Sequence, residues 1–111
     1  MNNILITGST GFLGSNLLNS LYNSNKIYLI LRKKNKIKNL IKKYKNVNII
    51  FYNKFDELNK KLKKCKIDIV IHCATHYVRN HNYSDVKKLN DSNIILGNIL
   101  LENLKHMKVK K

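Results

Sequence analysis

Hydrophobic residues along this chain alternate between short continuous runs and runs with helical spacing. Four continuous runs predict buried β-strands, over Asn3–Thr7, Lys26–Arg32, Val47–Tyr52 and Ile67–Ala74. Uninterrupted Ile, Val and Leu residues indicate strands that are covered on both faces, which is typical of a parallel sheet. Because each run is followed by a helical pattern, the sequence predicts a doubly wound α/β domain of about four strands with right-handed crossovers.

The segments between and after these runs predict four helices, at about residues 11–22, 37–44, 58–65 and 84–105, the last after a polar loop over residues 75–82. The residues expected to form their apolar stripes are Leu13, Leu17, Leu18, Leu21, Ile37, Leu40, Ile41, Tyr44, Leu58, Leu62, Cys65, Val86, Leu89, Ile95, Ile99 and Leu100. The basic tail KHMKVKK either begins a further strand at Met107–Val109 or is a frayed end.

Length and composition indicate a single small globular domain, with 111 residues of which 43% are hydrophobic. No apolar run approaches the roughly 18 residues that span a membrane. The chain enters its first strand without the basic segment and apolar core of a signal peptide, so we expect a cytoplasmic protein. The two cysteines, Cys65 and Cys73, are expected to be reduced thiols rather than a disulfide framework.

The net charge of +16 raises the question of a nucleic-acid partner. Lys, Asn and Ile together make up nearly half of the residues, whereas Pro, Trp and Gln are absent. These three residue types share A/T-rich codons, and selection for phosphate binding would not have raised uncharged Asn and Ile. We therefore attribute the charge mainly to genomic composition and expect no specific nucleic-acid partner; a selected basic surface is the alternative.

The first strand runs directly into a glycine-rich turn in ILITGSTGFLG, residues 4–14. At such a turn, Gly8 would permit the tight bend, Gly11 would let the backbone approach a pyrophosphate, and Gly14 would let the helix pack closely. Backbone N–H groups and the positive end of the helix dipole would then face the phosphates. A P-loop is excluded because Ser15 and Asn16 follow the last glycine. A turn without a ligand is the alternative, but one glycine would be enough for it.

Three motifs in order resemble the extended branch of the short-chain dehydrogenase/reductase superfamily, the NAD-dependent epimerase/dehydratase family. The first is the G-x-x-G-x-x-G turn within TGSTGFLGSNLLNSL. The second is IDIVIHCAT, residues 67–75, which is similar to the D-V-V-I-H-x-A-A strand of that branch. The third is NIILGNILLE, residues 93–102, which is similar to its N-x-x-G-T-x-x-L-L-E helix, with Leu96 where glycine is frequent. The resemblance covers almost the whole chain and implies a Rossmann-like NAD(P)-binding fold.

The resemblance implies a dinucleotide site along the glycine turn and the strand ends. NAD-preferring members carry an acid after the second strand, whereas this chain has RKK, residues 32–34, so we expect NADP rather than NAD. Surface cations without a ligand are the alternative. Asn53 stands where an Asp often contacts the adenine amine, with Asp56 as an alternative alignment. The implied cofactor-binding residues are Gly8, Gly11, Phe12, Leu13, Gly14, Arg32, Asn53, Cys73, Ala74, Thr75 and Asn93.

The loop HCATHYVRNH offers two further kinds of candidate. Tyr77 and Arg79 are weak candidates for contact with a nucleotide-sugar substrate. Cys73, His76 and His81 match no common zinc spacing, and we expect no metal site.

In the family that this chain resembles, a Tyr-x-x-x-Lys pair after the fifth strand transfers the proton. Tyr22–Lys26 and Tyr83–Lys87 have this spacing but not this context, so both are interpreted as coincidences and no catalytic residue is predicted. Residues 1–111 are thus expected to be the N-terminal part of an NAD(P)-dependent nucleotide-sugar epimerase, dehydratase or ketoreductase, inactive alone. We also expect an unpaired sheet edge at Ile69–Ile71.

The resemblance further implies that the full-length enzyme transfers hydride between a sugar carbon and nicotinamide, and that such enzymes are often homodimers. A non-catalytic dinucleotide-binding module or a truncated relic is the main alternative. A basic nucleic-acid-binding protein is the third hypothesis.

Overall fold

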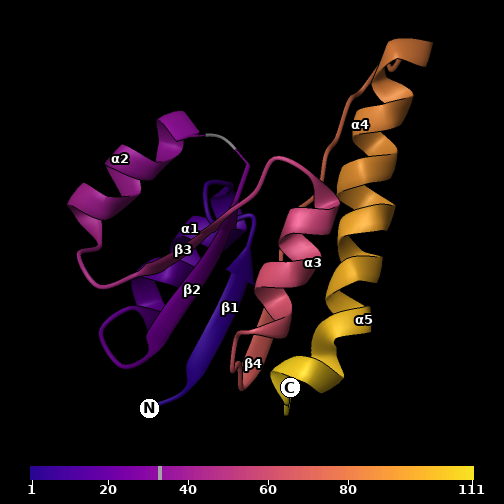
Figure 1. Ribbon diagram of the computed structural model, residues 1–111. Coiled ribbons are helices and arrows are strands. Elements are labelled where there is room, and N and C mark those ends of the chain that lie inside the picture. Colours follow the sequence, from indigo (N-terminus) through magenta and orange to yellow (C-terminus); the bar gives the residue numbers. More distant parts are fainter. Residues whose placement is uncertain (33) are drawn as a thin grey trace.

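The computed structural model describes residues 1–32 and 34–111, without the side chains of residues 34 and 35. One parallel sheet contains β1 (Asn3–Thr7), β2 (Lys26–Leu31), β3 (Asn48–Phe51) and β4 (Ile69–His72), in the order β3-β2-β1-β4 (Figure 1). In the central strand, Ile6 pairs with Leu29 of β2 and with Ile71 of β4. The predicted Rossmann-like α/β class is confirmed; β1 has the predicted bounds, and the other three strands are slightly shorter than the apolar runs that predicted them.

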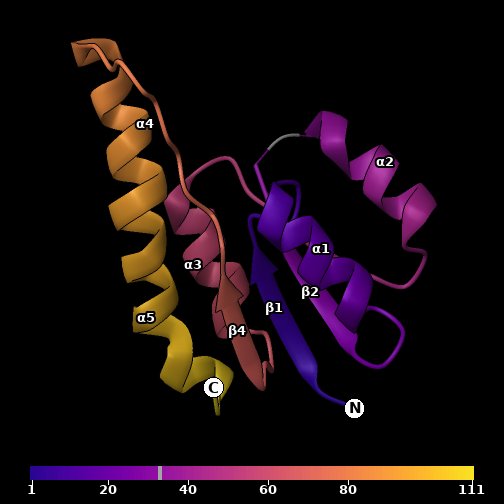
Figure 2. The ribbon, with the colours of Figure 1, turned by 180° about the vertical axis from the view of Figure 1, so that it is seen from behind.

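Helices cover both faces of this sheet. The helices α1 (Phe12–Leu21) and α2 (Lys34–Lys43) lie on one face, and α3 (Phe55–Lys63) and α5 (Leu96–Met107) lie on the other (Figures 1 and 2). A 3₁₀ turn (Tyr83–Asp85), α4 (Val86–Asn90) and a π turn (Asp91–Ile95) lead into α5. No helix in the described part of the chain is long and apolar enough to cross a membrane.

Alternation along β1 divides the core into two clusters. Ile4 and Ile6 pack with Leu18 of α1 on one face of the sheet. Leu5 packs with Leu58 of α3 and with the apolar side of α5 on the other face. Because successive side chains of a strand point to opposite faces, a sheet covered on both sides requires apolar residues at every position. This requirement explains the continuous runs in the sequence.

The predicted helix over residues 84–105 is not continuous α-helix, because the π turn Asp91–Ile95 interrupts it. In this chain Asn93 and Gly97 are separated by one residue more than in the N-x-x-G motif. A π turn accommodates a single additional residue within a helix. Leu96 is therefore buried in the core, while Gly97 lies beside the ring of His72.

Three residues that were predicted to face the sheet are exposed instead. Leu13 is 61% exposed because it lies in the first turn of α1, at the edge of the sheet. Ile41 and Val86 are 49% and 50% exposed. The helix α2 reaches the core through Leu40 and Tyr44, and Val86 lies in the short helix that precedes the packed part of α5.

The prediction of an unpaired edge at Ile69–Ile71 is wrong for Val70, whose backbone N–H has a hydrogen-bond partner. The chain turns after α5 at Lys108, which has a left-handed φ of 58°. Lys111 then donates its backbone N–H to the carbonyl of Asp68 at 3.2 Å and accepts from the N–H of Val70 at 2.8 Å. These two bonds flank Ile69, so the tail lies along β4 and is not frayed. The strand predicted at Met107–Val109 does not form, because α5 continues through Met107 and the chain turns at Lys108.

Candidate functional site

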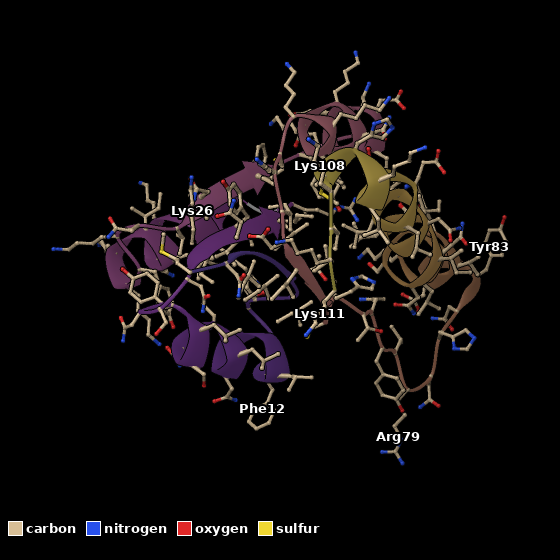
Figure 3. The ribbon with its side chains drawn as sticks, turned by 90° about the horizontal axis from the view of Figure 1, so that it is seen from below. Phe12, Lys26, Arg79, Tyr83, Lys108 and Lys111 are labelled. Atoms are coloured by element: carbon tan, nitrogen blue, oxygen red, sulfur yellow. The ribbon has the colours of Figure 1, made fainter. Side chains whose placement is uncertain are left out.

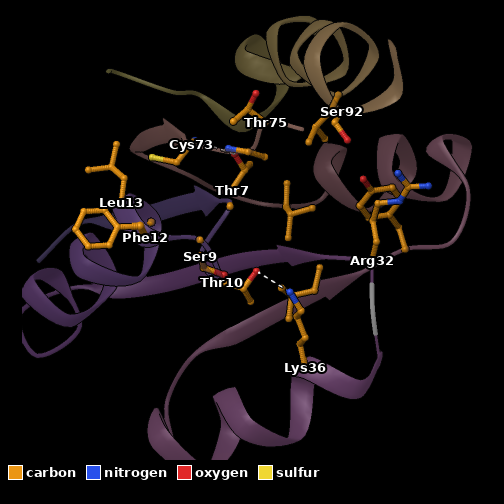
Figure 4. A pocket seen from close by; sticks show the side chains of 18 residues that line it. Thr7, Ser9, Thr10, Phe12, Leu13, Arg32, Lys36, Cys73, Thr75 and Ser92 are labelled. Carbon is orange, nitrogen blue, oxygen red and sulfur yellow. Dashed lines mark hydrogen bonds between the residues drawn. The ribbon is translucent and has the colours of Figure 1, made fainter. Parts of the chain in front are cut away.

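A cavity of about 600 Å³ lies at the carboxyl ends of β1, β2 and β4 (Figure 4). The chain leaves β1 toward β2 on one side and reaches β4 on the other side, so the strand order reverses here. Open parallel sheets bind ligands at such switch points. The cavity is lined by Thr7, Gly8, Ser9, Thr10, Gly11, Phe12, Leu13, Gly14, Ile30, Leu31, Arg32, Lys36, Tyr52, Cys73, Ala74, Thr75, Ser92 and Leu96.

The three glycines of the turn differ in how closely the backbone packs around them. Gly8 has a φ of 72°, and a Cβ there would lie 2.7 Å from the backbone nitrogen of Ala74. A Cβ on Gly14 would lie 2.6 Å from the carbonyl carbon of Gly8 and closer still to its oxygen. A Cβ on Gly11, by contrast, would meet only the Gly8 oxygen, at 3.4 Å. Gly8 and Gly14 are therefore needed for backbone packing, whereas Gly11 leaves the surface of the turn free for a ligand.

The amino terminus of α1 opens into the cavity. Its N-cap is Gly11, which provides no side-chain cap, and the first turn contains no acidic residue. The N–H groups of the first turn have no partner within the helix, and the helix dipole places positive charge at this end. An anion such as a phosphate is the ligand that this arrangement favours.

Ser9 supplies a further sign that a polar ligand belongs here. It is 1% exposed, and its hydroxyl has no hydrogen-bond partner among the described residues. A buried hydroxyl without a partner costs free energy, so such groups are rare unless a ligand or water completes them. Since Ser9 lines the cavity within the glycine turn, a phosphate oxygen fits its requirement.

Two cations lie at the end of the cavity formed by β2 and α2. The guanidinium carbon of Arg32 is 5.7 Å from the ring centre of Tyr52 and 5.8 Å from that of Phe55. The ammonium of Lys36 donates to the hydroxyl of Thr10 at 3.4 Å (Figure 4). Burial raises the pKa of the Tyr52 phenol, which therefore stays neutral beside the guanidinium. Lys33, the middle residue of the RKK motif, is outside the described residues.

The wall opposite α1 is the segment that follows β4. The hydroxyl oxygen of Thr7 accepts hydrogen bonds from the backbone nitrogens of Cys73 and Ala74, each at 3.1 Å. The same oxygen lies 2.6 Å from Nδ1 of His72. These bonds join the ends of β1 and β4 and hold the 73–74 backbone against Gly8.

Nine of the eleven sequence-predicted residues line the cavity, and Asn53 and Asn93 do not. The side chain of Asn93 accepts from the backbone nitrogen of His76 at 2.8 Å and donates to its carbonyl at 3.0 Å. It also accepts from the hydroxyl of Thr75 at 3.0 Å. Asn93 therefore fixes the loop after β4. The backbone nitrogen of Asn53 donates to the carboxylate of Glu57 at the start of α3, and Tyr52 lines the cavity instead.

The other candidates lie away from the cavity. Tyr77 is 82% exposed, and Arg79 extends from the tip of its loop, as Figure 3 shows. Tyr22 packs edge-on against Tyr44, and Tyr83 is 92% exposed at the beginning of the α4–α5 segment. In the described part of the chain, no group of three or more His, Cys, Asp or Glu side chains is arranged to hold a metal ion.

Sequence reasoning missed several residues of the cavity. Ser9 and Thr10 lie inside the glycine motif and could have been included from their position alone. Lys36 is one of many lysines, and no pattern distinguishes it from the others. Ser92 enters through the π turn, which sequence periodicity does not reveal.

Comparison with known proteins agrees with this geometry. The family model described as "NAD dependent epimerase/dehydratase family" matches residues 4–111. The chain belongs to the NAD-dependent epimerase/dehydratase family. It is 37% identical, over 97% of its own length, to a protein of Dictyostelium discoideum named dTDP-D-glucose 4,6-dehydratase, and it spans 27% of that relative.

Two solved structures share the fold of this chain. UDP-N-acetylglucosamine 4-epimerase from Methanobrevibacter ruminantium M1, in complex with UDP-N-acetylmuramic acid, superposes with a TM-score of 0.76 at 28% identity. The match covers 98% of this chain and 36% of that one. The Bordetella bronchiseptica enzyme WbmH, in complex with NAD+, gives a TM-score of 0.74 at 20% identity, with coverage of 97% and 36%. This chain of the epimerase/dehydratase family therefore spans about a third of these structures.

Proposed function

We propose that this chain is the dinucleotide-binding portion of a nucleotide-sugar epimerase, dehydratase or ketoreductase. The observation that carries the proposal is the glycine turn, where backbone packing requires Gly8 and Gly14 and the buried hydroxyl of Ser9 lacks a partner. The turn, the uncapped end of α1 and this hydroxyl together offer several donors to a pyrophosphate. In the turn itself the Ser9 hydroxyl finds no partner among the described residues.

We further propose that the chain prefers NADPH to NADH. In this fold the residue at the end of β2 contacts the adenosine ribose. An acidic residue there hydrogen-bonds the free ribose hydroxyls of NADH and so favours NADH. Arg32 occupies that position, and Lys36 provides a second cation on the same wall of the cavity. A guanidinium binds a phosphate through two hydrogen bonds, whereas an ammonium adds a point charge. Both cations therefore favour a 2′-phosphate.

In this proposal the chain's residues position the cofactor. The turn and α1 would hold the pyrophosphate, Tyr52 and Arg32 would lie toward the adenosine, and the 73–75 backbone would lie toward the nicotinamide; all of these residues line the cavity. The nicotinamide, when bound, accepts or returns a hydride. Neither Tyr22 nor Tyr83 lines the cavity, so we propose that the proton transfer at the sugar depends on residues outside this chain.

The proposed substrate is a nucleoside diphosphate sugar. Two proteins that this chain resembles are named as a dTDP-D-glucose 4,6-dehydratase and a UDP-N-acetylglucosamine 4-epimerase. We propose that the residues that bind the sugar lie outside residues 1–111, because the dinucleotide would occupy the cavity described above.

Calorimetric titration of the chain with NADPH and NADH tests this proposal, with Arg32→Asp and the matched control Lys38→Asp on the exposed side of α2. We expect NADPH to bind more tightly than NADH. Arg32→Asp should weaken NADPH binding by about tenfold or more while NADH binding is kept or improved, because a carboxylate repels the 2′-phosphate. Tighter binding of NADH to the unaltered chain would refute the NADPH preference, and binding of neither nucleotide would refute the site.

A further inference from the structure

The hydroxyl of Thr7 is hydrogen-bonded on three sides. Thr7 is 1% exposed, and its oxygen lies 3.1 Å from the backbone nitrogens of Cys73 and Ala74 and 2.6 Å from Nδ1 of His72. Backbone N–H groups only donate, so these two bonds occupy both lone pairs of the oxygen. The hydroxyl proton must then point at the remaining neighbour, which is Nδ1 of His72.

This arrangement determines the state of the imidazole ring. Because Nδ1 accepts a proton from Thr7, it carries none of its own, and the ring is neutral with its proton on Nε2. Nε2 lies 3.6 Å from the position of a Cβ on Gly97, beside a groove along β4 and α5. The residues that line the groove with His72 are Val70, Gly97, Leu100, Leu101, Leu104, Val109 and Lys111.

The groups around the ring favour the neutral form. Lys111 carries the one charged side chain among the residues that line the groove with His72. On the opposite side the ring contacts Thr7 of β1. This strand, Asn3–Thr7, contains no ionisable side chain. Desolvation lowers the pKa of His72 below its ordinary value of 6.5. The ring is therefore neutral at neutral pH.

We propose that His72 is a positioning residue for the dinucleotide site. Its neutral, Nε2-protonated ring orients the Thr7 hydroxyl, and this hydroxyl holds the Cys73–Ala74 backbone against Gly8. Protonation of Nδ1 then releases this backbone. This role is separate from the contacts made by the glycine turn itself. The part of the proposal that concerns nucleotide affinity rests on the proposed function, whereas the part that concerns the ring and the backbone does not.

Protonation places two donors, Nδ1–H and the Thr7 hydroxyl, opposite an oxygen whose lone pairs are already used. One bond must then be given up. Cys73 keeps a partner in either case, because its amide also donates to the backbone carbonyl of Thr7 at 3.2 Å. The amide of Ala74 donates to the hydroxyl, so its protection is the one that reports on a lost bond. The Ala74 nitrogen is also the atom that lies 2.7 Å from the place of a Cβ on Gly8. A shift of this backbone therefore changes the wall of the cavity directly.

The sign of the pH effect follows from the lowered pKa. The folded chain binds fewer protons at His72 than the unfolded chain between the lowered value and 6.5. The contribution of neutral His72 to the stability of the fold is complete above about pH 6.5. It decreases as the pH falls toward the pKa of His72 in the folded chain. The Ala74 bond is expected to be lost at lower pH, as the pH falls through the pKa of His72 in the folded chain.

NMR spectroscopy of the whole chain tests the first part without any nucleotide. Long-range proton–nitrogen spectra should show the Nε2–H form of His72, and the protection of the Ala74 amide against hydrogen exchange should fall as this ring titrates. In His72→Asn, whose side-chain oxygen replaces Nδ1 as acceptor and does not titrate, the protection should be independent of pH. His76, His81 and His106 are kept in this variant and act as internal controls. An Nδ1–H form, or equal pH profiles in both proteins, would overturn the proposal.

Titration with NADPH tests the second part. We expect the dissociation constant of the unaltered chain to rise as the pH falls through the pKa of His72 in the folded chain, and that of His72→Asn to change much less. Thr7→Val should lose Ala74 protection at every pH, whereas Thr7→Ser should retain it. Should NADPH fail to bind at any pH while Ala74 responds as described, the proposed function would be refuted and the positioning role of His72 would stand.

Discussion

The carbonyl carbon of Gly8 lies 2.6 Å from the position that a Cβ on Gly14 would occupy. The first turn of α1 therefore rests directly on the backbone that leaves β1. This contact brings the amino terminus of α1 to the carboxyl end of the central strand, where the cavity lies. The close packing of two glycines thus places the anion-binding end of a helix at the switch point of the sheet.

Gly14→Ala is expected to destabilise the fold by about 3 kcal/mol or more, because backbone atoms, which cannot rotate away, would overlap the added methyl group. Gly11→Ala is the matched control, and its Cβ would meet only the Gly8 oxygen at 3.4 Å. We expect Gly11→Ala to change the free energy of unfolding by less than about 1 kcal/mol while it weakens dinucleotide binding. Chemical denaturation measures the first effect and nucleotide titration the second. Equal stability of the two variants would contradict this account.

Lys36→Met is expected to weaken NADPH binding by about threefold to tenfold and to leave NADH binding unchanged, because only NADPH carries the 2′-phosphate that the ammonium would attract. Lys38→Met on the same helix serves as the control for lost charge. Fluorescence titration with both nucleotides at low and physiological salt measures the effect. A similar loss for both nucleotides would show that Lys36 does not distinguish them.

Asn93→Ala should loosen the loop over residues 73–82, because both backbone groups of His76 lose their side-chain partner. The chain contains two arginines, Arg32 and Arg79, so an arginine-specific protease reports on this loop. We expect cleavage at Arg79 to accelerate at least about fivefold, since proteolysis follows the population of the opened segment. Asn98→Ala, an exposed position of α5, is the control. Unchanged cleavage at Arg79 would show that other contacts hold the loop.

Bound NADPH should protect Cys73 from alkylation, because this thiol lines the cavity beside Ala74. Cys65 is an internal control outside the cavity, and burial raises the pKa of its thiol, which keeps the reactive thiolate scarce. Mass spectrometry after a short exposure to iodoacetamide gives both modification rates. We expect the nucleotide to slow modification of Cys73 and to leave Cys65 unaffected. Equal effects on both cysteines would indicate a change in overall stability rather than occupancy of the site.

Much of the cavity was predictable because its residues are close together in the sequence. The glycine turn follows an apolar strand directly, and the strand ends that bear Arg32 and Cys73 could be located from the ends of apolar runs. Leu13 was wrongly assigned to the core, because helical spacing gives the face of a residue but not whether the sheet extends beneath it. The same reasoning missed Lys36, whose role depends on where α2 lies relative to Thr10.

By itself the sequence determined the class of the fold, the order of its strands and helices along the chain, and the position of the glycine turn between β1 and α1. These features depend on local periodicity and on glycines three residues apart, which neighbouring residues encode directly. The tertiary structure alone decided the pairing of Lys111 with the edge of β4, the π turn that brings Ser92 to the cavity, and the bond between Thr7 and His72. Each of these depends on the spatial approach of segments that are far apart in the chain or on a local departure from regular spacing, and periodicity contains no information about either.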